Sequence, residues 1–157
     1  MEKGDLNLPA PDSILTRKKD EFPPLAIGRK LYKRTLDACL KMPKRYTYLI
    51  LQDVIQIAGH ILDDVKRANS IFVTNAHEFQ IRRDYWISAR ANLEALSTRI
   101  DTFLEIPDTF RYKDEQSGRM KGITISELEE ILDLTDQEIG LVSRTLESEK
   151  ERYKHLL

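Results

Sequence analysis

His60 and Asp64 lie four residues apart, a spacing that places an imidazole and a carboxylate on one face of a helix, where they can chelate a metal ion. Neither an HExxH pattern nor a second Glu-x-x-His element is present to complete such a site. The pattern favours a carboxylate that orients a surface histidine. The sequence therefore predicts no metal site.

Residues suited to other chemistry are equally scattered. The glycines form neither GxGxxG nor GxxxxGK[ST], the loops that cradle phosphates. The Arg-x4–6-His pattern of helical ribonucleases is missing, and Cys39, the single cysteine, falls inside a predicted helix as a small packing residue. No pair of residues suits acid–base or nucleophilic catalysis. The sequence predicts a protein that is not an enzyme, with no catalytic residue and no cofactor.

Basic residues around Pro43 are the remaining candidates. Lys44 and Arg45 stand in the turn before a long apolar-patterned segment, with Tyr46 and Tyr48 close by for stacking. The preceding segment adds cations that fall within about 100° of one another on a helix, namely Lys30, Lys33, Arg34 and Lys41. Such a strip can track phosphates with salt-dependent affinity. The alternative is a solvated helix face.

Arg82 is the sharper anomaly, because Phe79, Trp86 and Ala89 predict an apolar residue at its position. Its planar fork suits a carboxylate of a neighbouring subunit or the backbone of a partner. In the alternative, the helical seam opens here and the side chain extends to water. Both interpretations stay open. The candidate residues for binding nucleic acid or a protein partner are Lys30, Lys33, Arg34, Lys44, Arg45, Arg82 and Arg83.

The elements that position these residues are expected to form one soluble domain, because 157 residues bury a core without disulfides. The N-terminus lacks an apolar signal segment, and the longest apolar run, Tyr48 to Leu51, is too short to cross a bilayer. We expect a cytoplasmic protein with no membrane contact. Residues 1–47 carry 11 basic and 6 acidic side chains, whereas residues 123–157 carry 4 and 9. This asymmetry predicts polar contacts between the ends, or a site for an anion.

Apolar residues recur at helical spacing in four segments. Asn75 with Glu78, and Ser126 with Glu129, are the expected helix starts. Pro43 and Pro107 end the first and third helices. A polar loop, 107–122, connects the last two. The predicted helices are 25–42, 47–72, 76–106 and 126–156.

No segment alternates with period two, so the sequence predicts an all-α protein. The predicted architecture is an antiparallel up-and-down four-helix bundle over residues 25–157, preceded by a polar, proline-rich, flexible arm, 1–24. The apolar stripe of the second helix is unusually wide and needs more than one neighbouring helix to cover it. The residues that widen it are Ile50, Ile55, Ile57, Leu62 and Ile71.

Two segments carry a resemblance to a known family. MPKRYTYLILQDVIQIAGHILDDVKRAN, residues 42–69, places Pro43 shortly before a helix and Gln52 inside its first turns. ISARANLEALSTRIDTF, residues 87–103, leads from small residues into a Leu-Glu-x-Leu pattern. Over roughly residues 25–155 the chain resembles the small four-helix-bundle family of proteins encoded in intervening sequences of 23S ribosomal RNA genes. That family includes the accessory variability determinant (Avd) of diversity-generating retroelements.

The resemblance implies a non-catalytic adaptor that forms a homo-oligomer, a pentamer, partners a reverse transcriptase and contacts its RNA or cDNA. The apolar width of the second helix would supply the subunit interface. The chain departs from the basic accessory proteins in its net charge of -1. The alternative is a structural bundle that only self-associates, with the acidic fourth helix of one subunit facing the basic first helix of another. A helical nuclease or metal enzyme would need a set of ligands that the sequence lacks.

Overall fold

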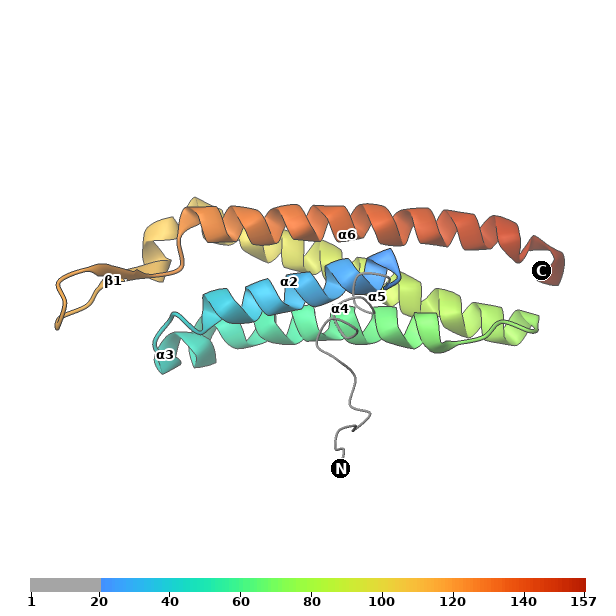
Figure 1. The fold of residues 1–157 in the computed structure, drawn as a ribbon, viewed down its shortest axis with the longest axis horizontal. Helices are drawn as coiled ribbons and strands as arrows, with labels where there is room; N and C mark the ends of the chain where they lie inside the picture. Colours follow the sequence, from blue (N-terminus) through green and yellow to red (C-terminus); the bar gives the residue numbers. More distant parts are fainter. Residues whose placement is uncertain (1–20) are drawn as a thin grey trace, which may run out of the picture.

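A computed structural model describes residues 21–157, and residues 1–20 of the predicted arm lie outside that part of the chain. Two short strands, β1 (Arg111–Lys113) and β2 (Met120–Gly122), accompany the helices. The prediction of an all-α protein is confirmed apart from this small sheet. The long helices are α2 (Pro23–Cys39), α4 (Gln52–Ser70), α5 (Ala76–Glu105) and α6 (Ile125–Arg152) (Figure 1).

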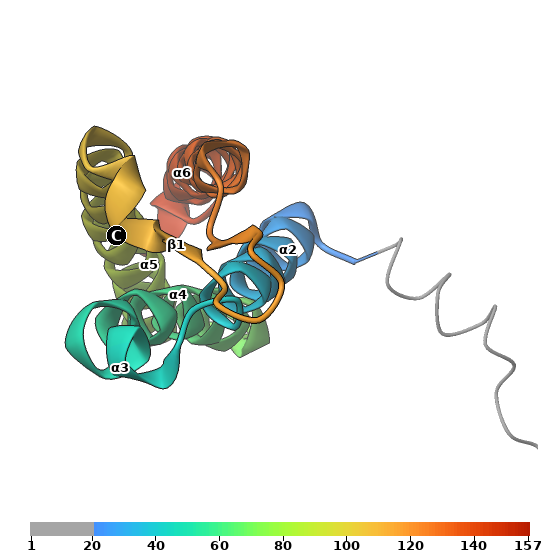
Figure 2. The same ribbon diagram turned by 90° about the vertical axis from the view of Figure 1, so that its left-hand side faces the viewer.

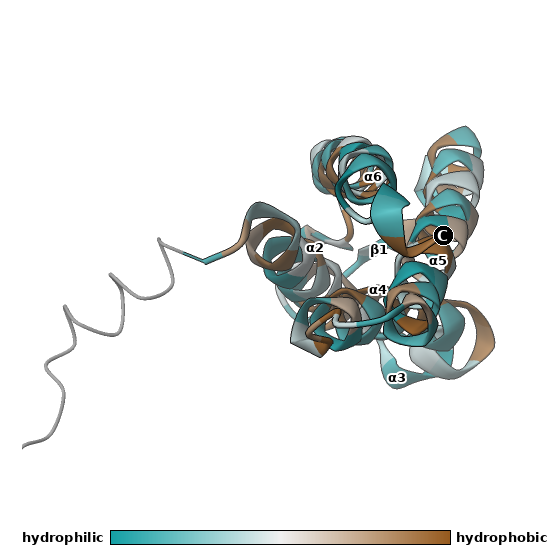
Figure 3. Cartoon of the chain, turned by 90° about the vertical axis from the view of Figure 1, so that its right-hand side faces the viewer, coloured by the Kyte–Doolittle hydropathy of each residue, from teal (hydrophilic) through white to brown (hydrophobic). Residues whose placement is uncertain are grey.

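Each long helix packs against two others. Helix α2 contacts α4 and α6, and α5 contacts the same two helices from the opposite side. Seen end-on, the four helices surround a common centre (Figure 2). Figure 3 shows hydrophobic and hydrophilic residues on each helix, as expected when one face is buried. The largest fully buried side chains at the centre include Trp86, Phe79, Phe110, Leu31 and Ile61.

Helix α5 agrees with its prediction in both its length and its buried face. Asn75 is the N-cap, and its side chain accepts a hydrogen bond of 2.9 Å from the Glu78 amide. The predicted apolar positions from Phe79 to Phe103 are all buried. The three-four spacing of these residues, interrupted only by Arg82, is therefore a sufficient signal for the longest element.

The start of α2 differs from its prediction by two residues. Pro23 and Pro24 occupy the first turn, where backbone amides have no acceptor within the helix. The absence of an amide hydrogen in proline therefore costs no helical hydrogen bond there. The two prolines therefore belong to the helix and not to the preceding arm. At the other end, α2 stops at Cys39, earlier than Met42, and Pro43 becomes the N-cap of α3, Lys44–Tyr46.

The prediction of one uniform α-helix over 47–72 is wrong in its C-terminal end and in the geometry of its first turn. The structure divides it into a π-helical turn, Thr47–Leu51, and α4, which ends at Ser70. Phe72 therefore lies beyond the helix and is 88 % exposed. The flanking residues Ile55 and Leu62 are half-buried and pack against the core of the same chain.

Helix α6 begins at a capping box two residues before the predicted one. The Thr124 hydroxyl accepts from the Glu127 amide at 3.1 Å, and the Glu127 carboxylate accepts from the Thr124 amide at 3.0 Å. Thr124–Glu127 and Ser126–Glu129 both fit the capping-box pattern. Ile123, the residue between β2 and the N-cap Thr124, is buried and packs in the core.

The prediction of a polar loop over 107–122 is also wrong, because these residues form a 3-10 turn, Pro107–Phe110, and the antiparallel hairpin β1–β2. Gly122, the last residue of β2, has φ +106°. A Cβ atom there would lie 2.0 Å from the carbonyl oxygen of Phe110. Only glycine accommodates both the backbone angle and the close approach.

In 126–156 the three-four spacing predicts a buried stripe that includes Leu132 and Ile139, and the buried face of α6 differs from it. Ile131, Leu134 and Glu138 are buried, whereas the predicted Leu132 and Ile139 are half-buried. Glu138 has no exposed surface, and neither of its carboxylate oxygens has a hydrogen-bond partner among the described residues. Burial raises the pKa of Glu138 to about 8, so the carboxyl group is mostly neutral at pH 7.

Candidate functional site

Cations gather at one end of the helical body. Helix α3 and the β1–β2 hairpin lie at the same end, next to the C-terminus of α2 and the start of α6 (Figure 1). Three cations come from the segment around Pro43, and four come from the hairpin. We call this cluster the basic end; it comprises Lys41, Lys44, Arg45, Arg111, Lys113, Arg119 and Lys121.

Ion pairs neutralise only part of the basic end. Lys41 pairs with Glu127, and Lys121 lies 3.4 Å from Asp114. Hydrogen bonds from Ser117 lower the pKa of Asp114, which keeps this acid ionised. Of the seven cations of the basic end, those with exposed side chains and no acidic partner within residues 21–157 are Lys44, Arg45, Lys113 and Arg119. These four are free to meet an anion.

One side-chain hydrogen bond joins the hairpin to the turn that follows α2, and another lies within the hairpin. The Tyr112 hydroxyl donates to the carbonyl of Lys41 at 3.4 Å, and an Arg111 guanidinium nitrogen donates to the carbonyl of Gly122 at 3.3 Å. A cavity of about 500 Å³ lies here, lined by Lys41, Arg111, Tyr112 and Lys121 among others. Glu127 also lines it, but its carboxylate is engaged by Lys41. The arrangement can bind a phosphate or a carboxylate.

The predicted strip on α2 is exposed but partly neutralised. Lys30 and Lys33 face solvent, and Arg34 lies 3.3 Å from Glu130 of α6. Together with Lys41–Glu127, this ion pair joins the basic helix to the acidic one within a single chain. The charge asymmetry of the sequence is therefore satisfied in part inside the chain.

Arg82 is bound internally, so neither sequence-based interpretation of it is correct. Its Nε donates to Oε1 of Glu149 at 2.8 Å, and a terminal nitrogen donates to Oε2 at 2.5 Å. The other terminal nitrogen donates to the carbonyls of Ala68 and Ile71, at 2.9 and 3.1 Å, at the end of α4. The guanidinium satisfies carbonyls that the helix end leaves open.

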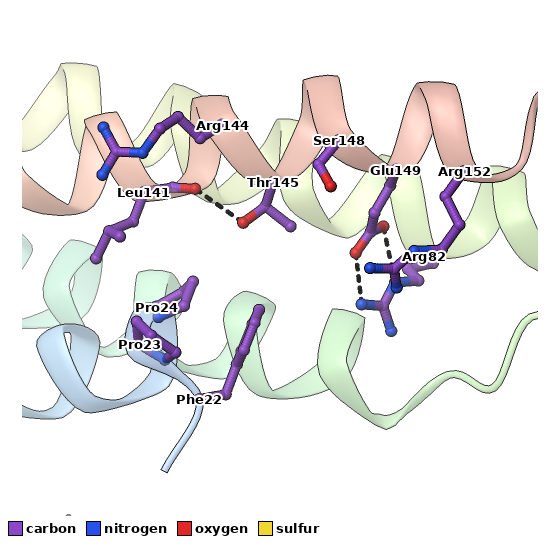
Figure 4. A pocket seen from close by; sticks show the side chains of 10 residues that line it. All are labelled: Phe22, Pro23, Pro24, Arg82, Leu141, Arg144, Thr145, Ser148, Glu149 and Arg152. Atoms are coloured by element: carbon purple, nitrogen blue, oxygen red, sulfur yellow. Dashed lines mark hydrogen bonds and ion pairs between the residues drawn. The ribbon is translucent and has the colours of Figure 1, made fainter. Parts of the chain in front are cut away.

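A second cavity, of about 290 Å³, lies beside this ion pair at the opposite end of α5 from the hairpin (Figure 4). Phe22 and Pro23 face it from the start of α2, and Arg144, Ser148 and Arg152 face it from α6. Glu149, the acid in this cavity, accepts from Arg82 and also from the indole nitrogen of Trp86 at 3.2 Å. Both carboxylate oxygens of Glu149 are thus engaged by donors from α5.

The candidate residues therefore separate into three groups. Lys44 and Arg45 belong to the basic end, and Lys30, Lys33 and Arg34 run along α2. Arg82 and Arg83 lie near the start of α5, which is 30 residues long and therefore about 45 Å in length. The structure does not bring Arg82 and Arg83 together with the others.

Side chains that could ligate a metal ion are dispersed over residues 21–157. No group of three or more metal-ligating side chains occurs among them. Asp64 is buried and accepts from Ser88 at 2.6 Å, rather than orienting the exposed His60. No helix in this part of the chain is long and apolar enough to cross a membrane.

Sequence reasoning missed the four hairpin cations. Arg111 and Lys113 alternate with Tyr112 on β1, and Arg119 and Lys121 flank Met120 on the facing strand. The available signal was a segment with four basic residues in eleven, interrupted by Ser117-Gly118.

No family model, curated protein or solved structure matches the chain.

Proposed function

We propose that this protein is a non-catalytic adaptor that binds RNA or cDNA through its basic end and partners a reverse transcriptase. The proposal includes an antiparallel up-and-down four-helix bundle that assembles as a homo-oligomer, a pentamer by the family resemblance. The partner and the assembly rest on the resemblance of residues 42–69 and 87–103. The nucleic-acid contact rests on the geometry of the chain itself.

The observation that carries the proposal is the convergence of two separate segments on one cationic surface. Lys44 and Arg45 come from α3, and Lys113 and Arg119 come from a hairpin that follows them by more than sixty residues. All four are exposed and have no acidic partner in the described chain. Neutralising phosphates with such cations releases counterions, which supplies affinity that falls as salt rises.

The test replaces Lys44, Arg45, Lys113 and Arg119 together with alanine and measures binding of a structured RNA by fluorescence anisotropy across salt concentrations. The logarithm of the association constant falls with the logarithm of salt by roughly 0.7 to 0.9 per phosphate contact. We expect a shallower slope and weaker binding for the variant. The matched control replaces four exposed cations of the helical body instead, Lys66, Arg90, Arg144 and Lys150. Equal losses in both variants would mean that only net charge matters and that the basic end is not the site.

The second candidate function is self-association without nucleic-acid binding. Exposed apolar side chains favour it, namely Leu40, Tyr48, Leu49 and Phe72, each at least 77 % exposed. Light scattering with and without RNA separates the two functions. An oligomer whose mass rises with RNA and returns as salt increases supports the adaptor, whereas an oligomer that ignores RNA supports self-association alone. A monomer that ignores RNA contradicts both.

A further inference from the structure

A stripe of four exposed side chains extends from the basic end onto α4. Lys44, Tyr48, Gln52 and Gln56 recur at intervals of four residues, and all four are exposed. The path runs from α3 through the π-helical turn Thr47–Leu51 into α4. A π turn is wider than an α turn, so a step of four residues is closer to one full turn and keeps these side chains on one face.

A shallow cavity of about 260 Å³ lies on this stripe. Tyr48, Gln52, Asp53 and Gln56 line it, beside Leu49. The Tyr48 ring is 77 % exposed and makes no aromatic or cation–π contact within residues 21–157. One face of an aromatic ring is thus presented to solvent at the rim of a polar cavity.

The polar groups of this cavity have unused hydrogen-bonding capacity. Neither Gln52 nor Gln56 makes a side-chain hydrogen bond to any described residue, although an amide both donates and accepts. Asp53 holds Arg99 of α5 through Oδ2 at 2.6 Å, and its Oδ1 is buried without a hydrogen-bond partner in the same part of the chain. The Arg99 contact fixes the Asp53 side chain beside α5.

These groups match the chemistry of a nucleobase. A base has a flat face that stacks on an aromatic ring and a Watson–Crick edge that combines donors and acceptors. That edge is hidden in a duplex and open in a single strand. Lys44, one turn before Tyr48, places a cation where the phosphate of the same nucleotide would lie.

We propose that the surface formed by Lys44, Tyr48, Gln52, Asp53 and Gln56 binds one unpaired nucleobase of a single-stranded RNA or DNA segment. The base stacks on Tyr48, its Watson–Crick edge meets the amides of Gln52 and Gln56, and its phosphate meets Lys44. This inference rests on the proposed function, because it assigns the base of a strand whose backbone the basic end holds.

The experiment compares full-length wild type with Tyr48→Ala, Tyr48→Phe and Phe72→Ala. Each binds a labelled single strand and a duplex of the same sequence, as RNA and as DNA, at low salt. Loss of one base–aromatic stack lowers affinity by roughly 5- to 150-fold. We expect this loss for Tyr48→Ala on single strands only. Tyr48→Phe keeps the ring and should bind as wild type does. Phe72→Ala, the matched control, removes an aromatic ring that is 88 % exposed and lies outside the cavity, and its binding should also be unchanged.

Each other outcome has a defined meaning. Equal affinity of wild type and Tyr48→Ala for single strands, with the salt dependence retained, overturns the base site and leaves the basic end standing. An altered oligomeric mass of Tyr48→Ala, with unchanged single-strand affinity, shows that Tyr48 contacts protein and also overturns the base site. If wild type binds neither strand nor duplex at low salt, both the base site and the proposed function fail. A preference of wild type for single-stranded RNA or DNA that Tyr48→Ala loses identifies the natural strand and supports the site.

Discussion

Arg82 of α5 and Glu149 of α6 form a two-point ion pair inside the protein, with donor–acceptor distances of 2.8 and 2.5 Å. Their side chains are only 11 % and 6 % exposed. The hydrogen bonds to Glu149 raise the pKa of Arg82 further above its usual range. The pair links α5 to α6, and the bonds from Arg82 to Ala68 and Ile71 link both helices to the end of α4.

Removing one partner of this pair leaves the other buried and uncompensated. We therefore expect Arg82→Met to lower the free energy of unfolding by about 3–5 kcal/mol. The double variant Arg82→Met/Glu149→Met should recover much of that loss, because it removes the buried charge. Urea unfolding followed by circular dichroism measures both. Arg83→Ala is the matched control and should change stability by less than about 0.5 kcal/mol. A similarly small effect of Arg82→Met would mean that the pair does not hold the helices together.

The start of α6 distinguishes two capping boxes that the sequence pattern treats alike. In the structure Thr124 caps the helix and Ser126 is an exposed residue of its first turn. Thr124→Ala should lower the free energy of unfolding by about 1 kcal/mol, because it leaves the Glu127 amide without an acceptor. Ser126→Ala should change it little. Thermal or urea unfolding measures both variants. A larger loss of stability for Ser126→Ala than for Thr124→Ala would show that Ser126 is the cap, as the sequence pattern predicts.

The success of sequence reasoning varied with the length of the element. Thirty residues of regular spacing sufficed for α5, whereas β1 and β2, at three residues each, are too short to show an alternation. Hydropathy assigns a charged residue to the surface, so it missed the burial of Glu138. For the candidate site, Lys44 and Arg45 were predicted. The hairpin cations were not, because only the folded chain brings the hairpin and α3 to the same end of the helical body.

The hairpin depends on Gly122 more than on its other glycine. Gly122→Ala would bring a Cβ atom within 2.0 Å of the Phe110 carbonyl oxygen at φ +106°, so the backbone has to move. We expect a loss of about 2–3 kcal/mol in the free energy of unfolding. Gly118 also has a positive φ, +71°, but nothing lies within 4 Å of its added Cβ. Gly118→Ala should therefore cost only about 1 kcal/mol. Equal costs would show that the close contact with Phe110 is relieved without penalty.

Glu138 of α6 lies against Gly28 of α2. A Cβ atom on Gly28 would be 2.8 Å from a Glu138 carboxylate oxygen, so the glycine makes the room that this carboxyl group occupies. Leu62 of α4 is also in contact with the Gly28 position, at 3.6 Å from the same added atom. The neutral form of Glu138 suits these apolar surroundings better than the carboxylate does.

The raised pKa of Glu138, from 4.5 to about 8, makes stability depend on pH. Between these values the unfolded chain releases the proton and the folded chain keeps it. The contribution of this group to the free energy of unfolding therefore falls by up to about 1.4 kcal/mol for each unit by which the pH rises. Its stabilisation is complete only below the pKa of the unfolded chain. Glu138→Gln cannot titrate, so its stability relative to wild type should improve steadily as pH rises from 5 to 8.

Urea unfolding of wild type and Glu138→Gln at four pH values in that range measures this relative gain. The control is Glu147→Gln, which changes an exposed carboxylate of the same helix and should follow wild type at every pH. If the wild-type and Glu138→Gln curves stay parallel, Glu138 is ionised in the folded protein. It must then have a partner, and the fit of α2 against α6 at Gly28 cannot depend on a neutral carboxyl group.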